Sequence, residues 1–313
     1  WQVRIWVGGE PSDWSQPASF GIGLLDPMDW QAQWIARYLL KLHQRERIRV
    51  HLLTIQPNYS GVVGLFFTMT SSSEVNYPSA TNKSFQVGEK LRYRVTYGFM
   101  DAGEAVMEVK STTKKGANRE LIHAVGTGRT LGGFNAFYKV HDVYESYLDK
   151  KGVFPWFFVR RVDEGGYKIN QDYTFHQNKY KVDNGKGKEF KIPIGIQDMV
   201  SSFYYARTMD FSNLKKNQTF EFKCFMDDEI YKLKIKYVGD EQISIRKGKF
   251  KCHKFVPVVQ TGRYFKSEDD VNFWITADDN KIPILVKAKI PVGVVKMHLV
   301  EWSGLKNDLK SKV

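Results

Sequence analysis

Cysteine and long apolar runs are both scarce in this sequence. Its 313 residues include two cysteines, Cys224 and Cys252, which excludes a disulfide-rich scaffold and a zinc site made of cysteines alone. The best apolar run, residues 61–69, is far shorter than the about 18 to 20 residues that a membrane-spanning helix needs. These absences favour a soluble domain that is held together by an ordinary hydrophobic core.

Recognisable catalytic and metal-binding motifs are also missing. The seven histidines are scattered and form no HxH or HExxH pattern, which argues against a metal site. The glycine-rich stretch at 126–133 lacks the Lys-Ser or Lys-Thr pair of a phosphate-binding loop. We therefore expect a protein that is not an enzyme, with no catalytic residue, no metal and no cofactor.

Positive charge and aromatic residues are abundant. The net charge is +13 and 14% of the residues are aromatic. The first 80 residues hold equal numbers of basic and acidic side chains, so the whole excess lies after them. Lys-rich strand faces could attract an anionic membrane surface, or they could serve solubility alone. Nucleic acid is not an expected partner.

Apolar and polar residues alternate through most of the chain after residue 84, for example over 91–97, 220–224 and 231–237. This period of two predicts antiparallel strands with one buried and one solvated face. One segment, 196–208, has a helical period, with Asp198 placed to cap its start. The sequence predicts a mainly β fold, a curved antiparallel sheet or incomplete β-barrel with one covering helix, and a β-bulge after Cys252.

The chain divides into four predicted regions. Residues 84–305 form the antiparallel β domain, and residues 306–313 form a polar tail that we expect to be frayed. Residues 36–83 contain a predicted amphipathic helix (36–55) and a linker, and loosely follow a displaced signal peptide; an ordinary buried segment is the alternative. Residues 1–35 alternate like the last hairpin of a β-sandwich. We expect residues 1–80 to pack poorly against the rest.

Several segments of the β domain resemble one family. They are FQVGEKLRYRVTYGFMDAGEAVMEV (85–109), VFPWFFVRRVDEGG (153–166), GIQDMVSSFYYAR (195–207), GKFKCHKFVPVVQTGRYF (248–265) and WITADDNKIPILVKAKIPVGVVKMHLV (274–300). They resemble the uncharacterised bacterial family catalogued as domain of unknown function thirty-one-oh-eight. The resemblance implies export to the periplasm or cell envelope. It carries no activity and no functional residue.

Two further likenesses are narrower. The final hairpin pattern is similar to that of the periplasmic lipoprotein carriers of the LolA and LolB type, which are open antiparallel barrels with a helical lid over an apolar cavity. In residues 1–35, SDWSQPASF, LLDP and DWQAQWI resemble the N-terminal accessory region of bacterial α-L-rhamnosidases. No catalytic barrel follows, so that activity is not carried over.

Two sets of residues are candidates for a site. Six aromatic residues either line an apolar cavity or belong to the plain core; they are Phe154, Trp156, Phe157, Phe203, Tyr204 and Trp274. Cys224 and Cys252 lie on the apolar side of predicted strands, where they form a disulfide or remain two buried thiols.

The leading hypothesis is a non-enzymatic envelope protein that binds a lipid or another apolar or amphipathic ligand in a barrel-like cavity. The alternative is a structural or protein-interaction domain whose barrel is filled by its own side chains. A weaker alternative, which depends only on residues 1–35, is an accessory to carbohydrate processing.

Overall fold

The computed structural model describes residues 75–258, 270–290 and 293–313, together with four short strands nearer the N-terminus. These strands are β1 (Trp6–Val7), β2 (Glu10–Pro11), β3 (Ile48–His51) and β4 (Phe66–Met69). The chain divides into two units, Trp1–Asn76 and Tyr77–Val313. In the first unit, β1 pairs with β2 and β3 pairs with β4.

Strand β3 corrects one expectation for the first unit. Ile48–His51 lies within the predicted helix of residues 36–55, yet it pairs antiparallel with Phe66–Met69. Ile48 and Val50 are β-branched residues, which favour a strand over a helix. Apart from the β1–β2 pairing within residues 1–35, the other predictions for residues 1–74 lie outside the described residues.

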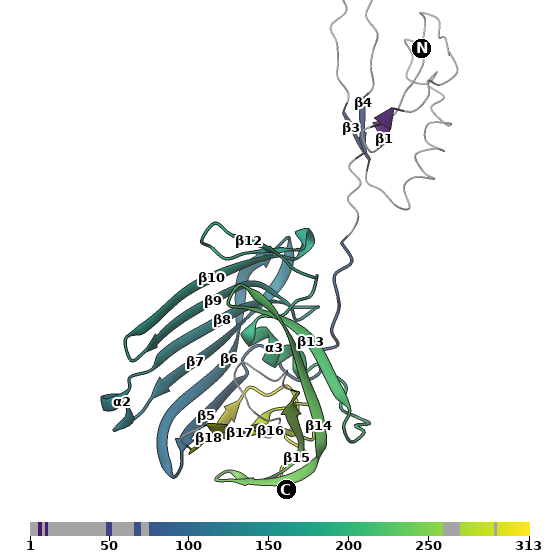
Figure 1. Ribbon diagram of the computed structural model, residues 1–313. Helices are drawn as coiled ribbons and strands as arrows, with labels where there is room; N and C mark the ends of the chain where they lie inside the picture. Colours follow the sequence, from purple (N-terminus) through teal and green to yellow (C-terminus); the bar gives the residue numbers. More distant parts are fainter. Residues whose placement is uncertain are drawn as a thin grey trace, which may run out of the picture. The chain divides into compact units, whose positions relative to one another are not determined.

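The second unit is built on a single sheet of antiparallel strands (Figure 1). The strands are β5 (Lys90–Tyr97), β6 (Met100–Gly116), β7 (Arg119–Thr130), β8 (His141–Asp149), β9 (Pro155–Glu164), β10 (Tyr167–His176), β11 (Lys181–Asp183), β12 (Glu189–Lys191), β13 (Thr219–Met226), β14 (Glu229–Ile245), β15 (Gly248–Pro257), β16 (Val271–Thr276), β17 (Pro283–Ile290) and β18 (Gly293–Ser303). Their order across the sheet is β12-β11-β10-β9-β8-β7-β6-β5-β18-β17-β16-β15-β14-β13. The outer strands β12 and β13 do not pair with each other, so the predicted curved sheet or incomplete barrel is confirmed.

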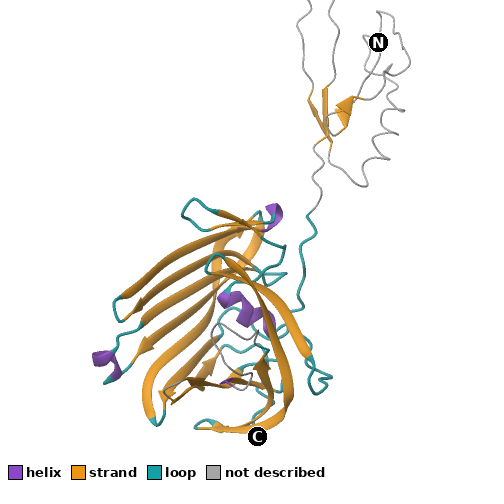
Figure 2. Cartoon of the chain, viewed as in Figure 1, coloured by secondary structure: helices purple, strands orange, loops and turns teal. Residues whose placement is uncertain are grey.

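The helices of the described residues are few. They are α2 (Phe134–Phe137), α3 (Met199–Ala206) and a 3-10 turn, η2 (Gln177–Lys179). Figure 2 shows α3 inside the curve of the sheet, where it contacts β7, β8 and β13. Asp198 caps α3 as predicted, because its carboxylate accepts from Ser201 N while Ser201 Oγ accepts from Asp198 N. The predicted covering helix is therefore present, whereas α2 was not expected.

Side chains and one loop join the two ends of the open sheet. Gln197, just before α3, forms a bridge with Cys224 on the outer strand β13. Asp227, in the β13–β14 turn, accepts from Arg160 Nη1 at 2.9 Å, and Asp228 accepts from the Tyr173 hydroxyl at 2.9 Å. An exposed sheet edge invites pairing with another chain, and these contacts cover part of that edge.

The predicted β-bulge is present on the neighbouring strand. Tyr237 of β14 lies opposite Phe255 of β15, and Gly239 lies opposite Lys254. The extra residue is therefore Val238 on β14, although the change of phase in the sequence falls on β15. A bulge places two residues opposite one, so the pattern of one strand cannot show which partner carries the extra residue.

The C-terminal tail is not frayed, which corrects that expectation. Lys251 N donates to Ser311 O at 2.8 Å, and Val313 N donates to Lys249 O at 2.9 Å. Asn280 Nδ2 holds the carbonyls of Asn307 and Asp308, each at 3.1 Å. The tail is polar in sequence, but its backbone is paired with the start of β15 and Ser311 is 1% exposed.

Candidate ligand-binding site

The six aromatic residues proposed as a cavity lining do not gather in one place. Phe154 and Trp156 pack with Leu121, and Phe157 packs at the border of that cluster. Tyr204 belongs to the largest core cluster and Trp274 to the cluster around Phe250, with Phe203 between these two. Phe154 and Tyr204 have 0% exposed surface. These two side chains are therefore packed core and not cavity wall.

Of the two alternatives for Cys224 and Cys252, a disulfide or two buried thiols, the structure shows the second. Both residues are buried free thiols. Cys224 lies opposite Tyr231 of β14 and Cys252 lies opposite Glu241 of the same strand, so they are about 30 Å apart along it. A disulfide needs Cα atoms within about 7 Å. Burial raises the pKa of each thiol to about 12, so neither is a nucleophile near neutral pH.

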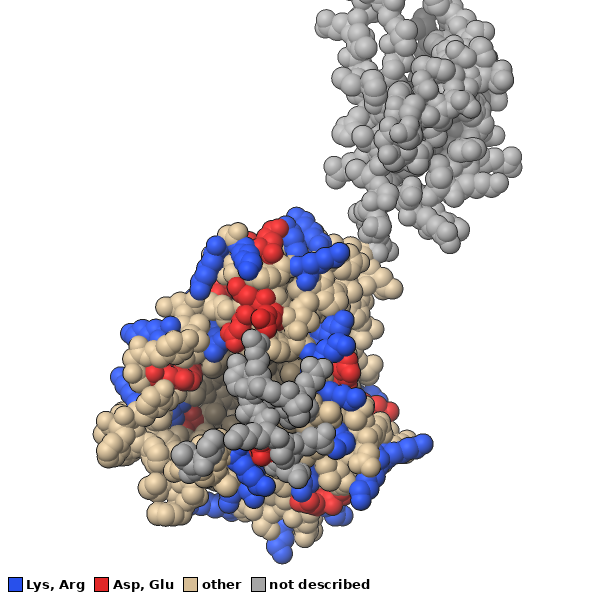
Figure 3. All heavy atoms as spheres, in the orientation of Figure 1, with Lys and Arg blue, Asp and Glu red and all other residues tan. Residues whose placement is uncertain are grey.

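The concave face of the sheet has two different halves. One half is covered by α3 and holds the largest core cluster. The other continues the same face with apolar residues that are only half-buried; this wall consists of Val95, Met107, Tyr144, Ile169, Val286 and Met297. Figure 3, which looks onto the open side of the sheet, shows a hollow on the side of β7–β10.

Strand register places the wall residues on the concave face. Met107 lies opposite the fully buried Leu91. Val95 lies opposite Met297, which in turn lies opposite Val286. Residues directly opposite each other share a face, and so do alternate residues along a strand. The wall therefore continues the core, and Met107 and Tyr144 form its border because they pack against the cluster that α3 covers.

Polar groups lie beside the wall on the same face. Arg160 lies opposite Tyr144 on one side and Gln171 on the other. The Nε atom of Arg160 and the Oε1 atom of Gln171 are buried and have no hydrogen-bond partner among the described residues. A buried donor or acceptor without a partner is costly. An apolar wall with a few such groups is the usual composition of a small-molecule site.

Two carboxyl groups lie near this arginine at the end of the wall. Burial, and then the hydrogen bond and the negative charge of Asp142, raise the pKa of Glu164. Asp142 is itself buried and accepts from Asp163 N at 3.2 Å. The concave face therefore carries both charge signs at its polar end.

The C-terminal end of α3 is anchored by a buried ion pair. Arg207 donates to both carboxylate oxygens of Glu89, at 2.6 and 2.8 Å, and to the carbonyls of Ser84 and Asn280. The side chains of Arg207 and Glu89 are 2% and 0% exposed. These bonds connect α3 to the start of β5 and to the β16–β17 turn, so they set the position of the helix inside the curve.

Asp198 makes the stability of this anchored helix dependent on pH. Burial raises its pKa from 3.8 to about 6, although Ser146 Oγ and Ser201 donate to it. A group with a raised pKa in the folded state contributes stability that is present below the unfolded pKa and is lost as pH rises through the folded pKa. We expect Asp198→Asn, which keeps an N-cap oxygen, to abolish this loss.

Urea unfolding at pH 4 and pH 7 measures the effect. The free energy of unfolding of Asp198→Asn, relative to the wild type, should rise by on the order of 2 to 3 kcal/mol between these pH values. Glu164→Gln is the control. It removes another carboxyl group with a raised pKa, but one that is more exposed than that of Asp198. Identical pH profiles for the wild type and Asp198→Asn would contradict the assignment.

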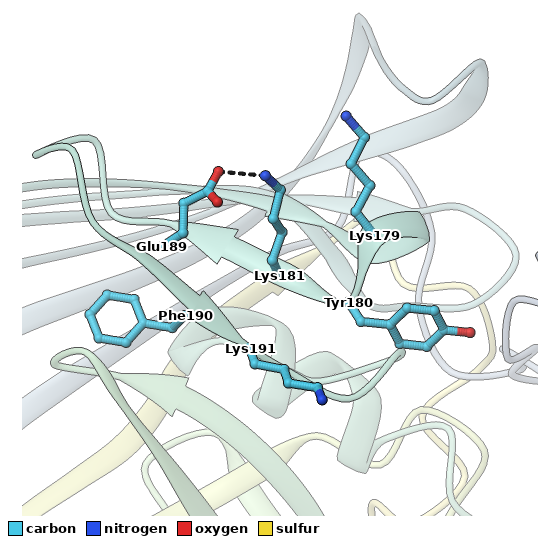
Figure 4. Close-up of a pocket in the computed structure, with 6 residues that line it drawn as sticks. All are labelled: Lys179, Tyr180, Lys181, Glu189, Phe190 and Lys191. Atoms are coloured by element: carbon cyan, nitrogen blue, oxygen red, sulfur yellow. Dashed lines mark hydrogen bonds and ion pairs between the residues drawn. The ribbon is translucent and has the colours of Figure 1, made fainter.

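Two surface depressions lie away from the concave wall. One, of about 480 Å³, lies along β11 and β12 and is drawn in Figure 4, where Lys181 pairs with Glu189 at 2.5 Å. The other, of about 600 Å³, lies between the segment after α3 and the start of β13. Both are open, and none of the six predicted aromatic residues lines either one.

No group of three or more His, Cys, Asp and Glu side chains in the described part of the chain could hold a metal ion. No helix among the same residues is long and apolar enough to cross a membrane.

The family model of DUF3108, described as a protein of unknown function, matches residues 92–300. The chain belongs to this family. The resemblance of the β domain is thereby confirmed, whereas the likeness of residues 1–35 to rhamnosidases and the expected export stay predictions. No curated protein matches the DUF3108 chain.

Solved structures of low sequence identity were also found. A β-barrel-like DUF1849 protein from Brucella abortus aligns with a TM-score of 0.46 and 12% identity, over 70% of this chain and 98% of its own. A DUF1089 family protein from Pseudomonas aeruginosa aligns with a TM-score of 0.27 and 8% identity, over 61% and 87% of the two chains.

The wall and its polar groups escaped sequence analysis for a definable reason. Alternation identifies the apolar face of each strand, and it does so for Val95 and Met297. It does not show which part of that face a helix covers. The only sequence signal for the polar end was Arg160, a charged residue at a position whose neighbours two residues away, Phe158 and Val162, are apolar.

Proposed function

We propose that this protein is a non-enzymatic envelope protein that binds an amphipathic molecule on the concave face of its sheet. The apolar part of the ligand lies on the wall. Its polar part lies against Arg160 and Gln171. The half-exposed wall is the observation that carries the proposal.

The wall supports binding because its apolar surface continues the core and its side chains are only half-buried. Removal of such surface from water is favourable by about 25 cal/mol per Å². An acyl chain offers that burial, and a polar headgroup offers partners to Arg160 Nε and Gln171 Oε1. A ligand with both parts fits the site better than a purely apolar one.

The rival hypothesis of a filled barrel applies to the other half of the concave face. There the side chains under α3 are packed against one another, and Phe158 and Tyr173 are only 2% and 1% exposed. The two halves therefore support different roles. The helix-covered half stabilises the fold, and the wall remains for a ligand.

A bulky side chain at Gly128 is expected to block the site. Gly128 lies opposite Ala105 and Asp142, on the concave face, and a Cβ there would meet only Asp142 Cβ at 4.0 Å. Gly128→Phe should therefore fill the hollow without disturbing the strand. We expect affinity for the fluorescent apolar probe N-phenyl-1-naphthylamine, and competition by a phospholipid, to fall at least about tenfold, or 1.4 kcal/mol.

Thr127→Phe is the matched control. Thr127 is the preceding residue of the same strand, faces the opposite side and is exposed. This variant adds the same ring outside the concave face, so probe binding should stay at the wild-type level. Equal binding by Gly128→Phe and the wild type, with both folded, would refute the proposed site, as would a wild type that binds no probe.

A further inference from the structure

Exposed apolar side chains gather at one end of the sheet. Phe99 is 96% exposed, Phe137 is 91% exposed and Tyr167 is 64% exposed. Large aromatic rings in water are unusual when they occur as a group. The members of this rim are Phe99, Met100, Phe137, Tyr138, Tyr167 and Ile290.

Topology explains why residues so far apart in sequence share one rim. The β5–β6, β7–β8 and β9–β10 connections and the paired residues Ile290 and Gly293 all lie at the same end, because neighbouring strands are antiparallel and β18 pairs with β5. Contacts join them. The rings of Tyr97 and Phe134 lie 6.5 Å apart, Gly98 N donates to Val294 O at 3.2 Å, and Gly165 N donates to Lys139 O at 2.8 Å.

Lysines accompany the exposed apolar side chains. Lys139 follows Tyr138, Lys168 follows Tyr167, and Lys289 precedes Ile290; all three lysines are exposed. Lys168 has an acidic neighbour, Asp163, at 3.7 Å. Aromatic rings and lysines together are suited to the boundary between water and lipid, where the ring enters the acyl region and the ammonium meets headgroups.

We propose that this rim docks the protein onto the surface of a lipid bilayer that contains anionic lipid. The exposed apolar side chains of the rim insert between headgroups, and the three lysines contact lipid phosphates. The wall begins at the same end of the sheet, near Val95 and Ile169, so docking brings that end of the wall to the lipid. The inference goes beyond the proposed function, because docking does not require a ligand on the wall.

A second copy of the chain fits the rim less well. In a two-fold symmetric contact each patch meets its own copy, so the lysines of one rim would face those of the other. The same charges are complementary to an anionic surface. The net charge of the chain, +13, also favours binding to an anionic surface.

Sedimentation of the full chain with lipid vesicles tests the proposal. The wild type should bind vesicles of phosphatidylcholine and phosphatidylglycerol more strongly than vesicles of phosphatidylcholine alone. The variant Phe99→Ser/Phe137→Ser should bind the anionic vesicles at least about tenfold more weakly. The variant Lys139→Gln/Lys168→Gln/Lys289→Gln should lose most of the dependence of binding on salt.

Val87→Ser/Tyr180→Ser is the matched control, because these side chains are 48% and 49% exposed at the opposite end of the sheet. It should bind like the wild type. Docking is overturned if the wild type binds no vesicle, if the rim variant and the control bind equally, or if the rim variant changes only the oligomeric state. Probe binding by the rim variant separates this result from a failure of the proposed ligand site.

Discussion

Replacement of Arg207 with methionine is expected to destabilise the β domain by about 3 to 5 kcal/mol, because it leaves the carboxylate of Glu89 buried without its partner. Glu89 is 0% exposed, and Arg207 supplies two hydrogen bonds to it. The same change removes the bonds to Ser84 O and Asn280 O, which join α3 to two distant parts of the sheet. Urea unfolding followed by tryptophan fluorescence measures the loss.

The double variant Arg207→Met/Glu89→Gln separates the orphaned charge from the lost connection. Glutamine carries no charge, so the double variant should recover a large part of the lost stability, since a buried pair is costly mainly when one partner is removed. Lys281→Met is a control that removes a neighbouring cation, which donates to the carbonyls of Arg207 and Met209. A loss below about 1 kcal/mol for Arg207→Met would contradict a structural role for the pair.

Phe225→Ala is expected to cost about 3 to 5 kcal/mol and to separate the two ends of the sheet. Phe225 lies on the outer strand β13 and is 1% exposed. Its ring lies 5.1 Å from that of Tyr173, 6.2 Å from that of Phe175 and 5.4 Å from that of Phe190. These partners belong to β10 and β12, at the other end of the strand order. The Phe225 side chain therefore joins two ends of the sheet that backbone hydrogen bonds would join in a closed barrel.

Hydrogen exchange of backbone amides provides the specific measurement for Phe225→Ala. Protection should fall first in β13 and in β11–β12, before the central strands β6–β8 are affected. Ile230→Ala is the control on the same hairpin, because Ile230 is 43% exposed and should change stability by less than about 1 kcal/mol. Uniform loss of protection across the sheet would show that Phe225 is ordinary core and not a closing contact.

An open sheet held together by side chains suits the two surfaces proposed here. A sheet closed by hydrogen bonds around its whole circumference is filled or has a fixed lumen. Here the ends are joined by Phe225, by the Asp227–Arg160 and Asp228–Tyr173 pairs, and by the segment before α3. Arg160 takes part in both the closure and the polar end of the wall. A ligand that binds Arg160 would therefore contact a residue that also joins the two ends of the sheet.

Local features of the fold could be predicted because they depend on neighbouring residues. Strand β5 has the predicted bounds of the alternating run, since a period of two is a property of one segment. The N-cap at Asp198 is likewise local, because a carboxylate accepts from an amide three residues later. A mainly antiparallel, curved architecture follows from many such strands in series.

Features that depend on distant partners could not be predicted. Cys224 and Cys252 are both on apolar faces, but only the strand order shows that β14 lies between their strands. The tail appeared free because it is polar, yet its backbone pairs with Lys249 and Lys251. Ile48–His51 forms a strand because Phe66–Met69 pairs with it.

The sequence by itself determined the β class of this protein, the positions of most strands, the cap of its helix and its family. The tertiary structure decided which part of the apolar face remains open, which turns form a rim and which side chains join the ends of the sheet. The physical reason is range. Periodicity and capping act over a few residues, whereas the wall, the rim and the Arg207–Glu89 pair depend on contacts between segments that only the folded chain brings together.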